Sequence, residues 1–294
     1  MKNNSNQLVI GVQNILYKPI GMMVMAVILF IVLPSTILQA QGGLLLTPKR
    51  IIFEGNKTSE SINLANLGTD TARYVISLVD LRMNEDGSFE EISQADAWQI
   101  SAEPYLRYFP RTVTLAPHEA QVIRVQFNRQ EQMVPGEYRS HIYVRALSTP
   151  TPLGEKEPEQ TTSIAVTLQP VFGISIPVII RVGETKATAF FSGISLETPD
   201  SASYALSMVL NRTGNMSIYG NIIVKYITPN GISTVVATVK GLAVYTPNNL
   251  RRIQLPLDIN MQIDCRHPGK LVVQFFSQEN GKDKKIAETE MVVQ

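Results

Sequence analysis

A run of alternating apolar residues most constrains how this 294-residue chain can fold. It lies within residues 161–181, and its apolar positions are Ile164, Val166, Leu168, Phe172, Ile174, Ile176, Val178 and Ile180. Successive side chains of a β-strand point to opposite faces, so these residues would line one face. A strand through all of them would span roughly 50–55 Å, whereas most strands have about five or six residues. The run therefore predicts β structure, and its length is unusual for a strand with a single role.

Short alternating segments separated by turn residues recur along most of the chain. Three dipeptides are typical of hairpin turns, namely Asp86–Gly87, Asn230–Gly231 and Asn280–Gly281. Closely spaced strands with intervening turns predict an all-β fold of the sandwich type. We expect two β-sandwich domains, residues 43–182 and 183–294, joined by only a few residues in a fixed, angled, boomerang-like arrangement.

The N-terminal segment has the features of an export signal. Residues 21–33 are an uninterrupted apolar run, which is short for a membrane span of about 20 residues but fits the apolar region of a signal peptide. Pro34 interrupts the run, and Ala40 places a small residue at a cleavage position. We expect residues 1–40 to be a signal peptide cleaved after Ala40, with an uncleaved membrane anchor as the alternative.

Composition and motifs argue against several classes of function. The formal net charge is +1 and there is no long Lys/Arg run, so a nucleic-acid partner is not expected. Cys265 is the only cysteine, so the chain has no internal disulfide, and the thiol is most simply structural. His118, His141 and His267 are scattered, without metal-ligand spacing. No nucleophile elbow, phosphate-binding loop or dinucleotide fingerprint occurs. We therefore expect no enzyme activity, metal or cofactor.

Four motifs within residues 44–182 resemble, in the same order, the PapD-like periplasmic pilus (fimbrial) assembly chaperones. "TPKRIIFEGNKTSESINLANLG" is similar to their first two strands, and "YFPRTVTLAPHEAQVIRVQF" to a strand pair with a Leu-x-Pro turn. "GEYRSHIYVRAL" is similar to their penultimate strand, and "IAVTLQ" with the apolar run after it to their edge strand. The second domain matches only in size and β character. The resemblance implies two immunoglobulin-like sandwiches, export to the periplasm and pilin subunits as clients.

The family's mechanism gives the long apolar run two roles. Such a chaperone binds, folds and caps a subunit that lacks one strand by lending it an edge strand, and delivers it to an outer-membrane usher. The resemblance implies Ile164, Val166, Leu168 and Phe172 as subunit-binding residues. Residues 174–180 would then fill the chaperone's own core. Alternatively, all of these residues would fill the core of one sandwich.

The resemblance also implies a basic anchor for the carboxylate at the C-terminus of the pilin. Arg50, which precedes "IIFEG", matches the first anchor, and a guanidinium suits bidentate carboxylate binding. The second anchor is normally a Lys on the edge strand, but Gly173 stands at that position. Lys49 is expected to point away from Arg50 into solvent. The alternative second anchors are Arg139, Arg145 and Arg181.

Two other functions stay open at the level of sequence. One is an exported two-domain immunoglobulin-like adhesin or assembly accessory protein, and the other is an enzyme with a site between the domains. The free chaperone could also form a self-dimer that masks its edge strand, because an exposed apolar edge favours pairing.

Overall fold

The computed structural model describes residues 43–94, 96–147, 173–200, 203–258, 268–279 and 282–293. The expected signal peptide, residues 1–40, lies outside the described residues, as do Ile164, Val166, Leu168, Phe172 and Cys265. In the described part of the chain the regular structure is β-strand, apart from the short 3₁₀ helix η1 (Glu103–Tyr105). No helix there has the length and apolar character needed to cross a membrane. The expectation of an all-β chain is confirmed.

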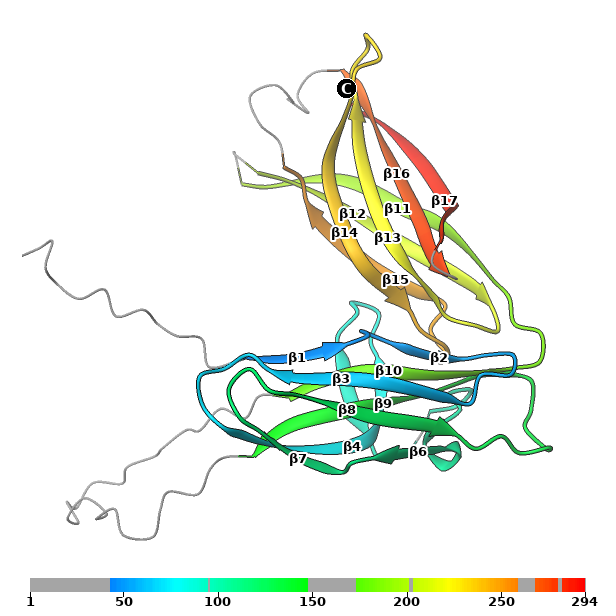
Figure 1. Ribbon diagram of the computed structural model, residues 1–294. Coiled ribbons are helices and arrows are strands. Elements are labelled where there is room, and N and C mark those ends of the chain that lie inside the picture. Colours follow the sequence, from blue (N-terminus) through cyan, green and yellow to red (C-terminus); the bar gives the residue numbers. More distant parts are fainter. Residues whose placement is uncertain are drawn as a thin grey trace, which may run out of the picture. The chain divides into compact units, whose positions relative to one another are not determined.

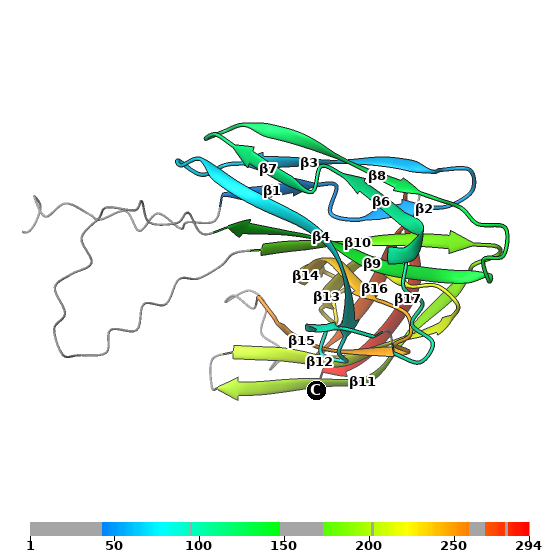
Figure 2. The same cartoon turned by 90° about the horizontal axis from the view of Figure 1, so that it is seen from below.

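The first β-sandwich consists of two sheets, seen as layers in Figures 1 and 2. One sheet has the order β1 (Leu44–Thr47), β3 (Ser59–Asn66), β8 (Ala120–Phe127), β6 (Leu106–Phe109). The other has the order β2 (Ile51–Phe53), β10 (Gly173–Val182), β9 (Gly136–Leu147), β4 (Ala72–Met83), β5 (Phe89–Ile92), with β7 (Thr112–Leu115) also paired to β4. The N-terminal segment contributes to both sheets, because β1 pairs antiparallel with β3 and β2 pairs parallel with β10.

The alternating sequence explains the core of this sandwich. On β8, Ile123, Val125 and Phe127 point inward and are buried, while the residues between them are exposed. The chain leaves one sheet for the other at Pro110, between β6 and β7. A proline cannot donate to a strand ladder, so this break divides a segment whose alternation alone predicts one continuous strand.

Strand β10 is buried on both faces over its second half. Ile176, Val178 and Ile180 belong to the core of the first sandwich, and Ile174 packs against that core. This confirms the expectation that the second part of the apolar run fills the chain's own core. Ile179 points the other way and is fully buried in a separate cluster, whose other buried members are Met83, Ala243 and Tyr245.

The second β-sandwich also has two sheets. One has the order β11 (Ala187–Asp200), β12 (Ser203–Gly214), β15 (Leu250–Pro256). The other has the order β14 (Ser233–Val244), β13 (Ile218–Ile227), β16 (Gly269–Glu279), β17 (Lys282–Val293). Inward residues of both sheets form one core, which includes Leu210, Ile222, Val273 and Phe275.

Two of the three expected hairpin turns lie in the described residues and form as expected. In the first, the Gly87 backbone N–H donates to the Asn84 carbonyl (2.9 Å) between β4 and β5. In the second, the Gly231 N–H donates to the Thr228 carbonyl (2.9 Å) between β13 and β14. Both glycines have positive φ (90° and 82°), which other residues rarely adopt. The third dipeptide, Asn280–Gly281, lies outside the described residues.

Candidate functional site: a free strand edge beside a basic pocket

Strand β10 has one free edge over its first half. All of β10 pairs with β9 on one side, but β2 pairs with it only from Val178 to Ile180 on the other side. Among the described residues, therefore, no strand covers that edge from Gly173 to Pro177. A strand edge of this kind presents backbone N–H and C=O groups that can pair with another chain.

At the start of this edge, the side chain of Tyr143 packs closely over Gly173. A Cβ built on Gly173 would lie 2.5 Å from Cε2 and Oη of Tyr143 on the neighbouring strand β9. The ring of Tyr143 thus occupies the space that a larger residue would need. A larger residue at position 173 would require the far end of the Tyr143 side chain to shift.

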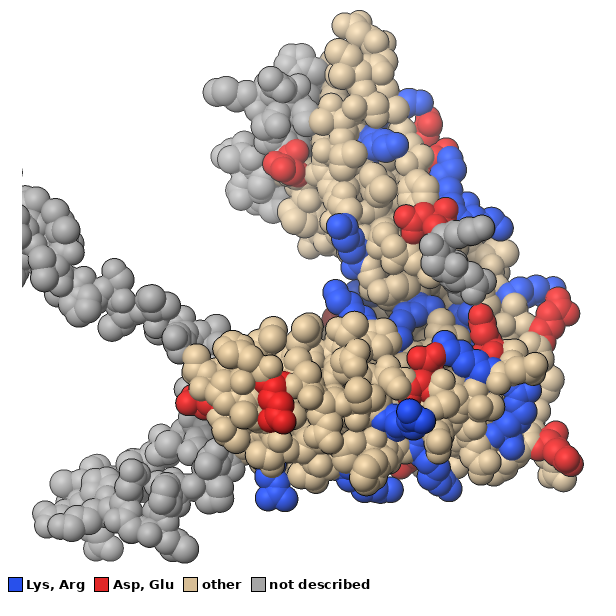
Figure 3. Space-filling model, viewed as in Figure 1, with Lys and Arg blue, Asp and Glu red and all other residues tan. Residues whose placement is uncertain are grey.

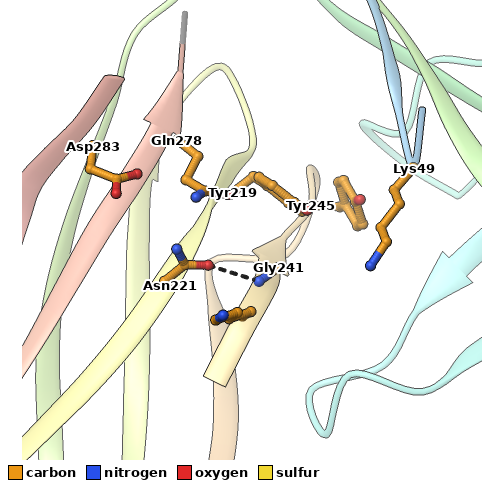
Figure 4. A pocket seen from close by; sticks show the side chains of 8 residues that line it. Lys49, Tyr219, Asn221, Gly241, Tyr245, Gln278 and Asp283 are labelled. Carbon is orange, nitrogen blue, oxygen red and sulfur yellow. Dashed lines mark hydrogen bonds between the residues drawn. The ribbon is translucent and has the colours of Figure 1, made fainter. Parts of the chain in front are cut away.

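A pocket of about 720 Å³ is lined by Lys49, which lies two residues before β2, and by residues of the second sandwich. Figure 4 shows Lys49 and Tyr245 on one side of the pocket and Gln278 and Asp283 on the other side. Between them, the Gly241 N–H donates a hydrogen bond to Oδ1 of Asn221. The lining residues are Lys49, Tyr219, Asn221, Lys240, Gly241, Tyr245, Gln278 and Asp283. We call this the basic pocket, since Lys49, Lys240 and the adjacent Arg50 outnumber its one carboxylate. In Figure 3 several Lys and Arg side chains lie together where the two sandwiches contact each other.

Arg50 is partly buried beside this pocket. Its guanidinium carbon lies 4.2 Å from the centroid of the Tyr219 ring, within the range of a cation–π contact. Burial raises the pKa of Tyr245 to about 12, although Arg50 and Arg139 act in the opposite direction. Tyr245 therefore stays neutral near pH 7, and the basic side chains leave the pocket suited to an anionic group.

The three alternative anchors have different surroundings. Arg139 is buried, donates from Nη2 to the Thr246 carbonyl (3.2 Å) and lies over the Tyr245 ring, with 4.7 Å from its guanidinium carbon to the ring centroid. Arg181 is also buried and forms ion pairs with Glu54 and Glu137, each at 3.3 Å. Arg145 is exposed on β9, opposite Gly173. None of the three lines the basic pocket. Lys49 is exposed, as the sequence predicted, and its side chain also lines this pocket.

The outward residues of β9 connect the two sandwiches next to this pocket. Glu137 is buried and accepts hydrogen bonds from the backbone N–H and hydroxyl of Ser217, from the Thr246 hydroxyl (3.2 Å) and from Nε of Arg181 (3.3 Å). His141 lies against the rings of Phe89 and Tyr245, at centroid distances of 5.6 and 6.4 Å. Burial first, and Arg139 second, lower the pKa of His141 to about 3.

Sequence reasoning found Arg50 but missed the rest of the pocket. Tyr219, Lys240 and Tyr245 belong to the second sandwich, for which the family resemblance offers no residue-by-residue match. Glu137 has the alternating position of an ordinary exposed strand residue, so no sequence signal marked it as buried. The assignment of Ile164, Val166, Leu168 and Phe172 to a client remains a prediction.

Comparisons with known proteins complete the description of the site. No family model matches the chain, and no curated protein matches it. Solved structures do match, and the first is the YadV chaperone, with 13% identity, 85% of this chain and 100% of that chain covered, and a TM-score of 0.44. Another solved structure that is similar to this chain is described as the class 5 fimbriae chaperone CfaA.

Two further matches have similar values. The CsuC–CsuE chaperone–tip adhesion subunit pre-assembly complex of Acinetobacter baumannii, from archaic chaperone-usher Csu pili, has 12% identity, 84% and 98% coverage and a TM-score of 0.42. The E. coli chaperone DraB has 15% identity, 84% and 95% coverage and a TM-score of 0.41. All three are described as chaperones or chaperone complexes.

Proposed function

We propose that this protein is an exported chaperone that captures pilus or fimbrial subunits by strand donation. The free edge of β10 from Gly173 to Pro177 is the observation that supports this best. It directly follows the alternating positions Ile164, Val166, Leu168 and Phe172, which would enter the apolar groove of a pilin. Burial of each apolar side chain would contribute about 1.5–3 kcal/mol, and backbone pairing would set the register.

The basic pocket would anchor the client's C-terminal carboxylate. We retain Arg50 as the first anchor and propose Lys49 and Lys240 as the cationic partners that stand in for the family's Lys. Arg50 immediately precedes Ile51, and Ile51 pairs with Val178, where the free edge ends. A client strand that pairs along Gly173–Pro177 and ends at Arg50 must therefore run parallel to β10, as β2 does.

The remaining assignments follow from this role. Residues 43–182 would form the client-binding domain and residues 183–294 a second domain that completes the pocket. The signal peptide would be cleaved after Ala40, and the mature chain would act in the periplasm. It would pass its subunits to an outer-membrane usher, and a self-dimer could cover the donor strand between clients.

Co-purification with pilins tests strand donation. The double variant Val166→Asp/Leu168→Asp should remain folded by circular dichroism yet lose the captured pilin, because two charges would enter an apolar groove. The matched control Val292→Asp changes an exposed residue of the second sandwich and should retain capture. Equal capture by the double variant and the control would rule out the donor strand.

Peptide binding tests the anchor in the same assay series. Arg50→Ala and Lys49→Ala should each weaken binding of a peptide from the C-terminus of a pilin about tenfold or more, because a hydrogen bond to a charged group contributes about 1.5–3 kcal/mol. The same peptide with an amidated C-terminus should bind weakly to the wild type and be insensitive to both variants. If the free and amidated peptides bind equally well, the basic pocket is not the carboxylate site.

A further inference from the structure

The only tryptophan of the chain, Trp98, stands out on the surface of the first sandwich. Its side chain is 90% exposed, and its backbone has φ of 69°, a conformation that residues other than glycine rarely adopt. Water contact over a whole indole is unfavourable, and tryptophan is among the residues that dominate binding at protein interfaces.

The loop that carries Trp98 is held firmly on both sides of it. Nε and Nη2 of Arg82 each donate to a different carboxylate oxygen of Asp96, both at 2.5 Å. The next anchor is the buried side chain of Gln99, whose Nε2 donates to the Leu81 carbonyl (3.3 Å). The Arg139 backbone N–H donates to the Ile100 carbonyl (2.9 Å) and fixes the following turn. A side chain presented by a fixed loop loses little conformational freedom on binding.

The surroundings of Trp98 are acidic. Residues 89–105 contain four carboxylates, those of Glu90, Glu91, Asp96 and Glu103, and no Lys or Arg. Arg82 of β4 pairs with Glu90 and Asp96, so Glu91 and Glu103 carry the remaining acidic charge. Glu91 and Glu103 are exposed. A partner for this surface needs an aromatic or apolar recess edged by positive charge, and an anionic membrane surface would be repelled.

The described residues contain a recess with this chemistry, namely the basic pocket. The rings of Tyr219 and Tyr245 line it, together with Lys49 and Lys240. Its volume of about 720 Å³ admits an indole. Trp98 does not occupy the pocket of its own chain, because nearly all of its side chain is exposed.

We propose that Trp98 of one copy inserts into the basic pocket of a second copy. The acidic residues around Trp98 face the lysines of the pocket, so the contact joins two different surfaces of the same protein. Such a contact is heterologous. It gives a closed assembly only if the second copy makes the same contact back to the first, or if several copies form a ring. The proposal concerns the free protein and holds whether or not the pocket also binds a client carboxylate.

Self-association of the purified chain beginning after Ala40 tests this proposal. Sedimentation velocity should show the average mass rising with concentration, and the emission of the single tryptophan should shift to shorter wavelength in parallel. Trp98→Gly should weaken association at least tenfold, because removal of a tryptophan hot spot has an effect of this order or larger. Glycine accepts the positive φ at this position, so the variant keeps the loop.

Charge reversal distinguishes this contact from a general loss of solubility. Glu91→Lys/Glu103→Lys and Lys49→Glu/Lys240→Glu should each abolish self-association, because like charges would then meet. An equimolar mixture of these two double variants should associate again, since acidic and basic surfaces are paired once more. The control Glu184→Lys/Asp258→Lys, at exposed carboxylates of other loops, should associate like the wild type.

Several results would overturn the proposal. They are a wild-type chain that stays monomeric at all concentrations, association unaffected by Trp98→Gly, or a mixture of the double variants that stays monomeric. A blue shift of Trp98 emission with phosphatidylglycerol vesicles, but not with protein concentration, would assign the residue to a membrane surface instead. Because no client is present, none of these results depends on the outcome of the pilin co-purification assays.

Discussion

Strands β8 and β9 of the first sandwich have the same alternating pattern but different surroundings. On β8 the outward residues Arg124 and Gln126 are exposed to solvent. On β9 the outward residues Glu137, Arg139 and His141 are all at least 96% buried, because the second sandwich packs over them. The comparison shows that a period of two fixes which residues share a face but not whether water reaches that face. On β9 the polar side chains became part of the contact between sandwiches.

The largest expected difference between the two strands is at Glu137. Glu137→Ala should lower the free energy of unfolding by about 3–5 kcal/mol, because it leaves the buried donors of Ser217 and Thr246 without their acceptor and removes one of the two carboxylates that pair with Arg181. Urea denaturation followed by circular dichroism measures the change. A loss below about 1 kcal/mol would show that the β9 face is not energetically distinct from an exposed one.

The second prediction concerns the pH dependence that His141 creates. Its pKa is about 3 in the folded protein and about 6.5 in the unfolded chain, so between these values only the unfolded state binds the proton. Stability should therefore fall as the pH is lowered from about 6.5 toward 3, by up to about 1.4 kcal/mol per pH unit from this residue. Above about pH 7 the residue should contribute no pH dependence.

The unfolding free energy of a variant without His141, subtracted from that of the wild type at each pH, separates this effect from those of other titrating groups. His141→Phe keeps an aromatic ring between Phe89 and Tyr245 but cannot be protonated. The difference in unfolding free energy between the wild type and this variant should shrink or reverse as the pH falls below 6.5. A difference that stays constant from pH 7 to pH 4 would contradict the buried, neutral histidine.

The smallest expected effect is on β8 and serves as the reference for the other two. Arg124→Ala and Gln126→Ala should each change the unfolding free energy by no more than about 0.5 kcal/mol, because exposed strand residues away from special contacts contribute little. The same denaturation series measures both. A loss of more than about 2 kcal/mol at either position would mean that the two strands do not differ in the way that their exposure indicates.

The sequence predicted the elements of the fold better than their contacts. Three predictions were correct because each depends on a few neighbouring residues. They are the buried alternation of residues 174–180 and the turns at Asp86–Gly87 and Asn230–Gly231. Arg50 was found through its motif, and it does lie beside a basic pocket. Lys49 is exposed, as predicted, but its place in the pocket lining was missed because a local pattern does not contain the second sandwich, which supplies Tyr219 and Lys240. Trp98 gave no signal either, because its exposure depends on how the loop is tied to Arg82 and Leu81.

The short pairing of β2 with β10 has a consequence for any client strand. Because Ile51 already occupies the edge of β10 at Val178, a guest strand on that edge has a fixed end beyond which it cannot extend. In the proposed complex, the client's last segment would pair with β10 between this end and the start of the donated strand. That distance would therefore set how many residues the segment contains. One added residue at a client's C-terminus would shift its pairing by one position and turn each groove-facing side chain to the opposite face. A chaperone with this architecture would thus discriminate among exported proteins by where their chains stop.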